Sequence, residues 1–131
     1  EGFIYHFDQS HDIAELFLVS DMLITDYSSV MFDYSILNRP MFFFAYDFYK
    51  YKNELRGFYF SYRGEMPGPI SFTTEALIED IKNYDAREYE EKYLHFHNKF
   101  NSIDDGMASG RVMELINSLI PSRLPDLYYG E

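Results

Sequence analysis

Apolar positions along the first third of the chain fall either at helical spacing or in short continuous runs. Residues 11–19 carry apolar side chains near helical spacing and predict a helix. The runs at 21–25 and 41–45 are short and apolar, which is typical of buried strands. Residues 30–37 between them predict a second helix, which ends at a proline-containing turn. This strand–helix–strand order predicts a right-handed βαβ crossover and a parallel sheet.

The rest of the chain follows other patterns. Residues 3–7 form an aromatic and β-branched run that predicts a strand or a strand end. Residues 46–74 are rich in aromatics without periodicity, and Pro67-Gly68-Pro69 argues against regular structure there. Three helices are then expected, at 74–83, 86–100 and 108–119. A proline ends the last of them, and residues 121–131 are expected to form a poorly packed tail.

Composition and charge narrow the class of protein. With 131 residues, 47% of them hydrophobic and 20% aromatic, the chain suits one folded domain with a modest core. Its formal net charge of −11 argues against nucleic acid as a partner and against docking of this segment alone on anionic lipid. The absence of cysteine excludes disulfides and thiolate metal sites, and the four histidines show no zinc spacing, so we expect no metal or cofactor. No signal peptide and no run of membrane-spanning length occur.

A hydroxyl-rich turn follows the first predicted strand. Thr25-Asp26-Tyr27-Ser28-Ser29 lies where that strand ends and the next helix begins. Ligands of open α/β sheets collect at the carboxyl ends of strands, and a helix start offers unpaired N–H groups that suit phosphate. Asp33 lies one turn further on the same helix face, where it could orient Ser29 or take a ligand hydroxyl. The alternative is a capping serine beside a surface carboxylate.

A second cluster precedes the last predicted helix. Asp104-Asp105-Gly106 is a cap-and-turn sequence, and Arg111 falls in the opening turns of the helix that follows. Because the helix dipole disfavours a cation at this position, we expect an anion close to Arg111. That anion is either Asp104 or Asp105, or a ligand phosphate, which guanidinium geometry suits.

Two further features have mainly structural interpretations. Residues 56–60 and the Pro-Gly-Pro sequence could wall a pocket, but the pattern favours an ordinary connection. His95 and His97 are two residues apart on a predicted helix, so they point apart and do not share a metal. We expect both to be surface or interhelical residues.

Short motifs run along the chain in a fixed order. They are residues 21–34, Leu37-Asn38-Arg39-Pro40, Tyr46-Asp47, Arg56-Gly57-Phe58-Tyr59, Pro67-Gly68-Pro69, Phe100-Asn101 and Asp105-Gly106-x-Ala108-Ser109-x-Arg111-Val112. Across roughly residues 3–117, this series resembles the CDP-glycerol glycerophosphotransferase family, the teichoic-acid primases and polymerases. Each motif alone is weak, but the series together is specific.

The resemblance implies a fold of the GT-B glycosyltransferase type, in which two Rossmann-like halves face a cleft. This chain would be part of the C-terminal, nucleotide-binding half, an α/β domain with a parallel sheet flanked by helices. Residues 1–120 would belong to that Rossmann-like domain, and residues 121–131 would form the C-terminal tail. Because the chain does not begin with Met, we also expect it to be a piece of a longer protein.

The resemblance also implies roles for five residues. Ser28 and Ser29 would contact the donor diphosphate, with Asp33 in the same donor-side cluster. Arg111 would reach a phosphate, and Asp105 would lie near the nucleotide or support the loop. All five would bind the donor, so the sequence identifies no catalytic residue.

The implied reaction transfers glycerol phosphate or ribitol phosphate from a CDP-activated donor to a teichoic-acid-like or capsular polymer. An acceptor hydroxyl attacks the donor's β-phosphorus and CMP leaves, so catalysis depends on positioning and on neutralising phosphate charge. Relatives in this family carry histidines at positions that no histidine matches here, and His6 is the nearest candidate. We therefore expect the catalytic base to lie outside this chain and the isolated chain to be inactive.

The expected partners are the CDP-polyol donor and, through a missing N-terminal half, a lipid-linked or polymeric polyol-phosphate acceptor. The full-length protein is expected at the cytoplasmic face of the plasma membrane. Two alternatives stay open, namely a GT-B glycosyltransferase that uses a nucleotide sugar and a non-catalytic nucleotide-binding or interaction module. The sequence does not distinguish glycerol from ribitol, or a primase from a polymerase.

Overall fold

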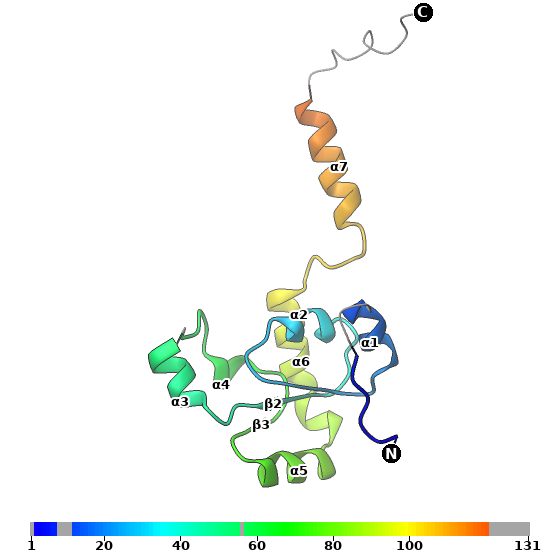
Figure 1. Cartoon of the computed structure of the whole chain (residues 1–131). Coiled ribbons are helices and arrows are strands. Elements are labelled where there is room, and N and C mark those ends of the chain that lie inside the picture. Colours follow the sequence, from blue (N-terminus) through cyan, green and yellow to red (C-terminus); the bar gives the residue numbers. More distant parts are fainter. Residues whose placement is uncertain (1, 8–11, 56, 121–131) are drawn as a thin grey trace, which may run out of the picture.

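The computed structural model describes residues 2–7, 12–55 and 57–120, and its fold is α/β. A three-stranded parallel sheet lies at the centre in the order β1-β2-β3 (Figure 1). The strands are β1 (Leu23–Thr25), β2 (Met41–Phe44) and β3 (Ile70–Ser71). Leu23 is opposite Met41, and Phe43 is opposite Ile70. Because both pairings are parallel, the carboxyl ends of all three strands lie at one edge of the sheet.

Helical segments make up most of the remaining described structure. In the described residues they are α1 (Ile13–Val19), α2 (Val30–Ser35), α3 (Phe48–Lys50), the π-helical turn η1 (Tyr51–Leu55), α4 (Tyr62–Glu65), α5 (Thr74–Lys82), α6 (Ala86–Phe100) and α7 (Ala108–Leu119). Three of them begin at a side-chain cap. Asp12, Thr73 and Asp85 accept hydrogen bonds from backbone N–H groups two or three residues further on, at 2.9, 3.2 and 3.0 Å.

Strand β2 forms the centre of the core. Its first three residues are buried because helices cover both faces of the sheet, which explains the continuous apolar run in the sequence. On one face, β2 packs with the fully buried rings of Tyr34 from α2 and Phe96 from α6. Phe42 points to the other face, where its ring centroid lies 5.2 Å from that of Tyr84 and where α5 packs.

A tyrosine on α6 completes the backbone hydrogen bonding where β2 begins. The Tyr93 hydroxyl accepts a hydrogen bond from the Met41 N–H at 2.6 Å and donates one to the Arg39 carbonyl at 2.9 Å. Burial raises the pKa of Tyr93, so its hydroxyl keeps its proton at any ordinary pH. This one side chain therefore fixes α6 to the start of the central strand.

Pro67-Gly68-Pro69 leads directly into β3. A Cβ atom on Gly68 would lie 1.8 Å from the Met41 carbonyl oxygen, so glycine allows the connection to pass close to β2. The Pro69 carbonyl accepts a hydrogen bond from the Phe43 N–H at 2.9 Å. The motif is therefore a structural connection, the interpretation that the sequence favoured.

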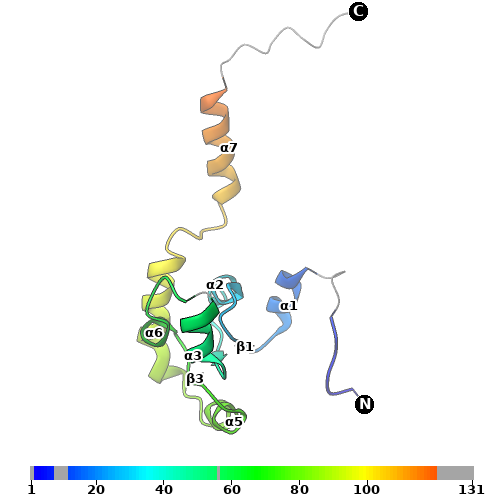
Figure 2. The ribbon, with the colours of Figure 1, turned by 60° about the vertical axis from the view of Figure 1, so that its left-hand side comes forward.

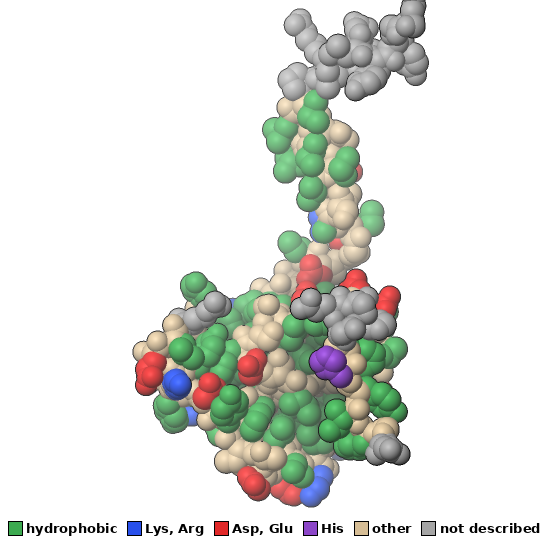
Figure 3. All heavy atoms as spheres, viewed as in Figure 1, with side chains coloured by type: hydrophobic (Ala, Val, Ile, Leu, Met, Phe, Trp, Pro, Cys, Tyr) green, Lys and Arg blue, Asp and Glu red, His purple; other side chains and the backbone are tan. Residues whose placement is uncertain are grey.

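Helix α7 projects away from the rest of the molecule (Figures 1 and 2). None of its residues is buried, and apolar side chains such as Leu115 and Leu119 are 59% and 72% exposed. Figure 3 shows hydrophobic side chains, in green, exposed along this helix. Across the described ranges, no helix has both the length and the apolar character needed to cross a membrane.

The predicted elements compare closely with the observed ones, with two exceptions. The parallel pairing is confirmed, and the helices at 86–100 and 108–119 have the predicted ends. Residues 46–74 are wrongly expected to be irregular, because α3, η1, α4 and β3 lie there. Residues 3–7 are wrongly expected to be a strand, because they take no part in the sheet that the described residues form. His11, Arg56 and the 121–131 tail lie outside the described residues.

Candidate functional site

The loop between β1 and α2 is a tight, internally bonded turn. The Asp26 carboxylate accepts a hydrogen bond from the Ser28 N–H at 3.1 Å. The Ser28 hydroxyl in turn accepts one from the Val30 N–H at 3.4 Å. Ser29 stands at the N-cap of α2, but its side chain makes no capping hydrogen bond and is exposed. Two hydroxyl groups therefore lie side by side at the carboxyl edge of the sheet.

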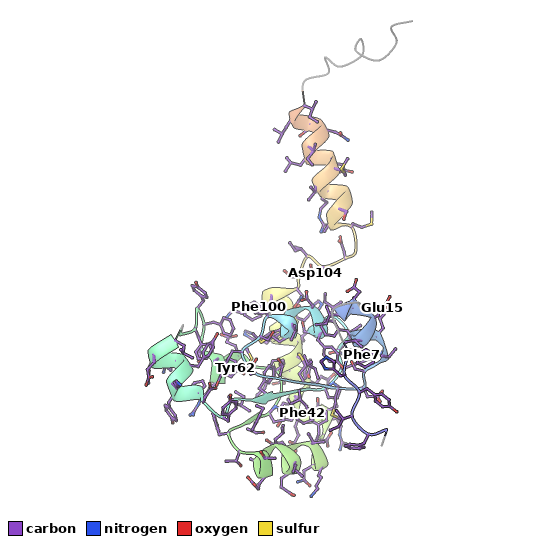
Figure 4. All side chains as sticks on the ribbon, viewed as in Figure 1. Phe7, Glu15, Phe42, Tyr62, Phe100 and Asp104 are labelled. Atoms are coloured by element: carbon purple, nitrogen blue, oxygen red, sulfur yellow. The ribbon has the colours of Figure 1, made fainter. Side chains whose placement is uncertain are left out.

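Two tyrosines hold this loop in place. The Tyr62 hydroxyl donates to the Asp26 carbonyl at 2.7 Å, and the Tyr27 hydroxyl donates to the Asp47 carboxylate at 3.0 Å. The second bond joins the loop after β1 to the loop after β2. Burial raises the pKa of both hydroxyls, and Asp47 raises that of Tyr27 further, so both remain proton donors. Figure 4 labels Tyr62 beside the strands.

The start of α2 offers fewer free backbone donors than the sequence predicts. The N–H groups of Met31 and Phe32 donate to the carbonyls of Ser28 and Ser29, at 3.4 and 3.0 Å. With the Ser28 and Val30 N–H groups also bonded, the Ser29 N–H is left without an acceptor among the described residues. The prediction that several unpaired N–H groups at this helix start would bind phosphate is therefore wrong. In addition, α2 is short, with six residues. Any phosphate here would depend mainly on the two hydroxyl groups.

Asp33 lies further along α2. It is exposed, and within the described part of the chain its carboxylate makes no hydrogen bond, so it does not orient Ser29. The other possibility predicted from the sequence, a contact with a ligand hydroxyl, stays a prediction.

Arg111 and Asp105 form an ion pair with each other. The Arg111 Nη1 atom lies 2.8 and 2.7 Å from the two carboxylate oxygens of Asp105, and Nη2 donates to the Ile103 carbonyl at 3.0 Å. Asp105 also accepts a hydrogen bond from the Met107 N–H at 2.9 Å, and its pKa is lowered, chiefly by Arg111. The pair is about half exposed, with 46% of the Arg111 side chain and 56% of the Asp105 side chain accessible. Of the anions considered for Arg111, Asp105 is the one that meets it here.

A buried asparagine connects the two predicted parts of the site. Asn101 is 4% exposed, and its amide nitrogen donates to the Phe32 carbonyl at 3.1 Å and to the Asp104 carboxylate at 2.8 Å. Its amide oxygen accepts from the Ser35 hydroxyl at 2.9 Å. Asn101 therefore ties α2 to the segment that leads to Arg111. Figure 4 shows Asp104 where that segment leaves the body of the molecule.

The structure does not bring the two parts into direct contact. No hydrogen bond or ion pair in the described residues links Arg111 or Asp105 to Ser28, Ser29 or Asp33. Arg111 lies on the projecting helix α7, while the serines lie on the body (Figure 1). Asn101 is the link between them, and its place in the Phe100-Asn101 motif is the only sign of this role in the sequence.

An aromatic cavity of about 470 Å³ adjoins Ser29. Its walls include Tyr27, Tyr51, Phe58 and Tyr59. The sequence of residues 56–60 allows a pocket wall but favours a simple connection. The structure shows that residues 57–60 do line a cavity, although the Pro-Gly-Pro sequence is not among the residues that line it.

The described histidines form no metal site. No group of three or more His, Asp or Glu side chains among the described residues could hold an ion. His95 Nε2 lies 3.0 Å from the Glu65 carboxylate, which also accepts a hydrogen bond from Lys99 at 2.7 Å. The pKa of Glu65 is lowered by Lys99 and His95. These contacts link α6 to α4, so the interhelical role expected of His95 is confirmed.

Fold and site together define a class of protein. The parallel α/β sheet is of the Rossmann-like class, in which ligands bind at the carboxyl ends of the strands, and the Ser28–Ser29 loop lies at that edge. Residues 1–118 match the family described as CDP-glycerol:poly(glycerophosphate) glycerophosphotransferase, and the chain belongs to that family.

Relatives of known activity support the same assignment. The chain is 50% identical over 119 residues to a teichoic acid poly(glycerol phosphate) polymerase of Staphylococcus epidermidis, covering 89% of this chain and 16% of the relative. It is 48% identical over 118 residues to a teichoic acid glycerol-phosphate transferase of Staphylococcus aureus, covering 88% and 30%. The chain thus spans less than a third of the length of these relatives.

A solved structure shows the same fold. The wall teichoic acid polymerase TagF matches with a TM-score of 0.73 and 51% identity, covering 84% of this chain and 27% of that chain. A variant of TagF has also been solved after a soak with CDPG. Because TagF is a GT-B-type polymerase, the fold class expected from the sequence is confirmed.

Proposed function

We propose that this chain is the donor-binding part of a transferase that moves glycerol phosphate or ribitol phosphate from a CDP-activated donor to a teichoic-acid-like or capsular polymer. The observation that carries the proposal is the Ser28–Ser29 pair, held at the carboxyl edge of the sheet by the hydrogen bonds of Tyr62 and Tyr27. A braced loop keeps its hydroxyl groups in place before the ligand arrives, which lowers the entropy cost of binding. Membership of the family supports a CDP-activated polyol phosphate as the donor.

In the reaction, an acceptor hydroxyl oxygen attacks the β-phosphorus of the donor. A new phosphodiester bond forms, the bond from that phosphorus to the bridging oxygen breaks, and CMP leaves with the bonding electrons. The acceptor proton passes to a base. Ser28 and Ser29 donate hydrogen bonds to the diphosphate, which places the phosphorus and offsets part of its charge.

Arg111 supplies the positive charge that the serine loop lacks. Its guanidinium is already paired with Asp105, so a phosphate would compete with that carboxylate or share the guanidinium with it. Both side chains are about half exposed, so a ligand can reach them. Asp33 completes the donor side by accepting a hydrogen bond from a donor hydroxyl. Movement of α7 toward α2 would bring Arg111 to the diphosphate, with Asn101 at the base of that segment.

We place the base outside this chain, in the larger part of the relatives that the chain does not span, since it covers 16% and 30% of their lengths. The acceptor, a lipid-linked or polymeric polyol phosphate, would also bind elsewhere in the full-length protein. We place that protein at the cytoplasmic face of the plasma membrane. Attachment would use other segments, since the net charge of −11 disfavours anionic lipid here. The isolated chain should give no turnover with radiolabelled donor.

Calorimetry on the 131-residue chain tests the proposal. CDP-glycerol or CDP-ribitol should bind, and the double substitution Ser28→Ala with Ser29→Ala should weaken binding at least about tenfold, since each hydrogen bond to a charged group contributes about 1.5–3 kcal/mol. Ser118→Ala is the matched control, because this exposed hydroxyl bonds only to its own helix on α7. Tighter binding of a UDP-sugar would favour a sugar transferase instead. Binding of no nucleotide at all would favour an interaction module.

A further inference from the structure

The aromatic cavity beside Ser29 has no part in the phosphate chemistry described above. Seven of the ten residues that line it are aromatic, and none carries a charge at neutral pH. Its volume of about 470 Å³ lies within the range of roughly 300–1,000 Å³ that is usual for small-molecule sites. Phosphate needs cations or several N–H donors to offset its charge, and this lining offers neither. The cavity suits a flat, neutral ligand group.

The rings of the cavity wall form a fixed stack. Tyr27 and Tyr51 are stacked with their centroids 4.0 Å apart and their planes 26° from parallel. Phe58 stacks on Tyr51 at 5.3 Å and on the buried Tyr62 at 4.8 Å. Because the Tyr27 hydroxyl is bonded to Asp47, the stack is tied to the same loops that hold the serines. The wall is therefore in place before any ligand binds.

Tyr59 differs from its neighbours in the cavity wall. Its side chain is fully exposed, at 108% of the reference accessibility, although it lines the same cavity. A tyrosine that buries no surface in its own protein contributes little to the fold, yet it can cover one face of a ligand ring. Aromatic side chains bind nucleic acid bases in this way, through stacking that tolerates any base.

From these observations we propose that the aromatic cavity is the subsite for the nucleobase of the donor, with Tyr59 stacked on the pyrimidine ring. The assignment rests on the proposed function, since Ser29 lies in the same lining and would hold the diphosphate at the cavity rim. A nucleotide then lies with its uncharged ring among the aromatics and its charged part at the hydroxyl groups. The Asp47 carboxylate is held beside the cavity by its hydrogen bond from the Tyr27 hydroxyl and would repel a phosphate in the reverse orientation.

Titration of the 131-residue chain with cytidine and with CDP-glycerol, followed by NMR or calorimetry, tests this subsite. Tyr59→Ala should weaken both ligands by the same factor, on the order of tenfold, because both share the base. Tyr59→Phe keeps the ring and should retain wild-type affinity. Tyr5→Ala, which removes another exposed tyrosine at 72% accessibility outside the cavity, is the matched control and should change neither affinity. Circular dichroism verifies that each variant is folded.

The outcomes separate the subsite from the proposed function. If Tyr59→Ala leaves both affinities within twofold while the Ser28→Ala and Ser29→Ala double variant loses CDP-glycerol, the subsite is refuted and the donor site stands. An equal loss in Tyr59→Ala and Tyr5→Ala also refutes the subsite. If the wild-type chain binds neither cytidine nor CDP-glycerol, both proposals fail together.

Discussion

The hydroxyl of Tyr93 offers the most direct measurement of what holds this fold together. Tyr93→Phe removes a single oxygen atom and leaves the ring in the core between α6 and β2. It leaves the Met41 N–H and the Arg39 carbonyl without their present partner. Met41 is fully buried, so water does not replace the lost acceptor.

The expected cost follows from these two bonds. A buried donor left unpaired costs about 1–3 kcal/mol, and the lost bond to the Arg39 carbonyl adds about 1 kcal/mol. Phenylalanine recovers part of this because no hydroxyl has to be desolvated. We expect the free energy of unfolding to fall by about 2–3 kcal/mol, a large share of the stability of a domain of this size.

Urea denaturation followed by far-ultraviolet circular dichroism measures this difference. With a slope of about 1–3 kcal/mol per molar urea, the midpoint should fall by about 0.7–3 M while the slope stays unchanged. Tyr89→Phe is the control on the same helix, since the Tyr89 hydroxyl makes no hydrogen bond within the described residues. It should change stability by less than about 0.5 kcal/mol. Equal effects of the two substitutions would refute the reasoning.

Two further predictions concern alkaline pH and the approach of the chain to β2. Burial raises the pKa of Tyr62 and Tyr93 above the ordinary value of 10.0. The unfolded chain loses these protons near pH 10, whereas the native chain keeps them. The free energy of unfolding should therefore fall above pH 10 by about 1.4 kcal/mol per pH unit for each tyrosine. Equal urea midpoints at pH 9 and pH 10.5 would contradict this. Gly68→Ala would place a Cβ 1.8 Å from a strand carbonyl and should cost at least about 2 kcal/mol in the same assay. Gly110→Ala, where a Cβ meets nothing within 4 Å on α7, should instead stabilise slightly, and equal effects of the two alanines would count against the close approach.

Helix ends were predictable where local chemistry determines them. The helix at 86–100 begins at Asp85, whose carboxylate accepts a hydrogen bond from the Arg87 N–H, and this cap depends only on neighbouring residues. The central strand was equally clear, because its continuous apolar run has no other stable location than a buried sheet. Short elements were not predictable. Strand β3 has two residues and exists only because Pro69 and Ser71 pair with β2.

Residues 3–7 show the opposite case, a strand that was predicted but did not form. The run has the composition of a strand, yet a strand also requires a neighbour to complete its hydrogen bonds, and composition does not supply one. In the candidate site, too, the sequence predicted the residues but not the contacts that hold them. Ser28 and Ser29 were found from their place after an apolar run, but the bonds that hold their loop come from Tyr62 and Asp47, which are distant in sequence.

The sequence by itself determined the parallel α/β class, the family and the two clusters of polar residues, because these follow from local periodicity and from motifs in a fixed order. Only the tertiary structure decided what those residues contact. It paired Arg111 with Asp105, bonded most of the N–H groups at the start of α2, and assembled an aromatic cavity from rings up to 35 residues apart, Tyr27 to Tyr62. Such contacts join residues that are distant in sequence, so they depend on how the whole chain folds and cannot be predicted from a local sequence pattern.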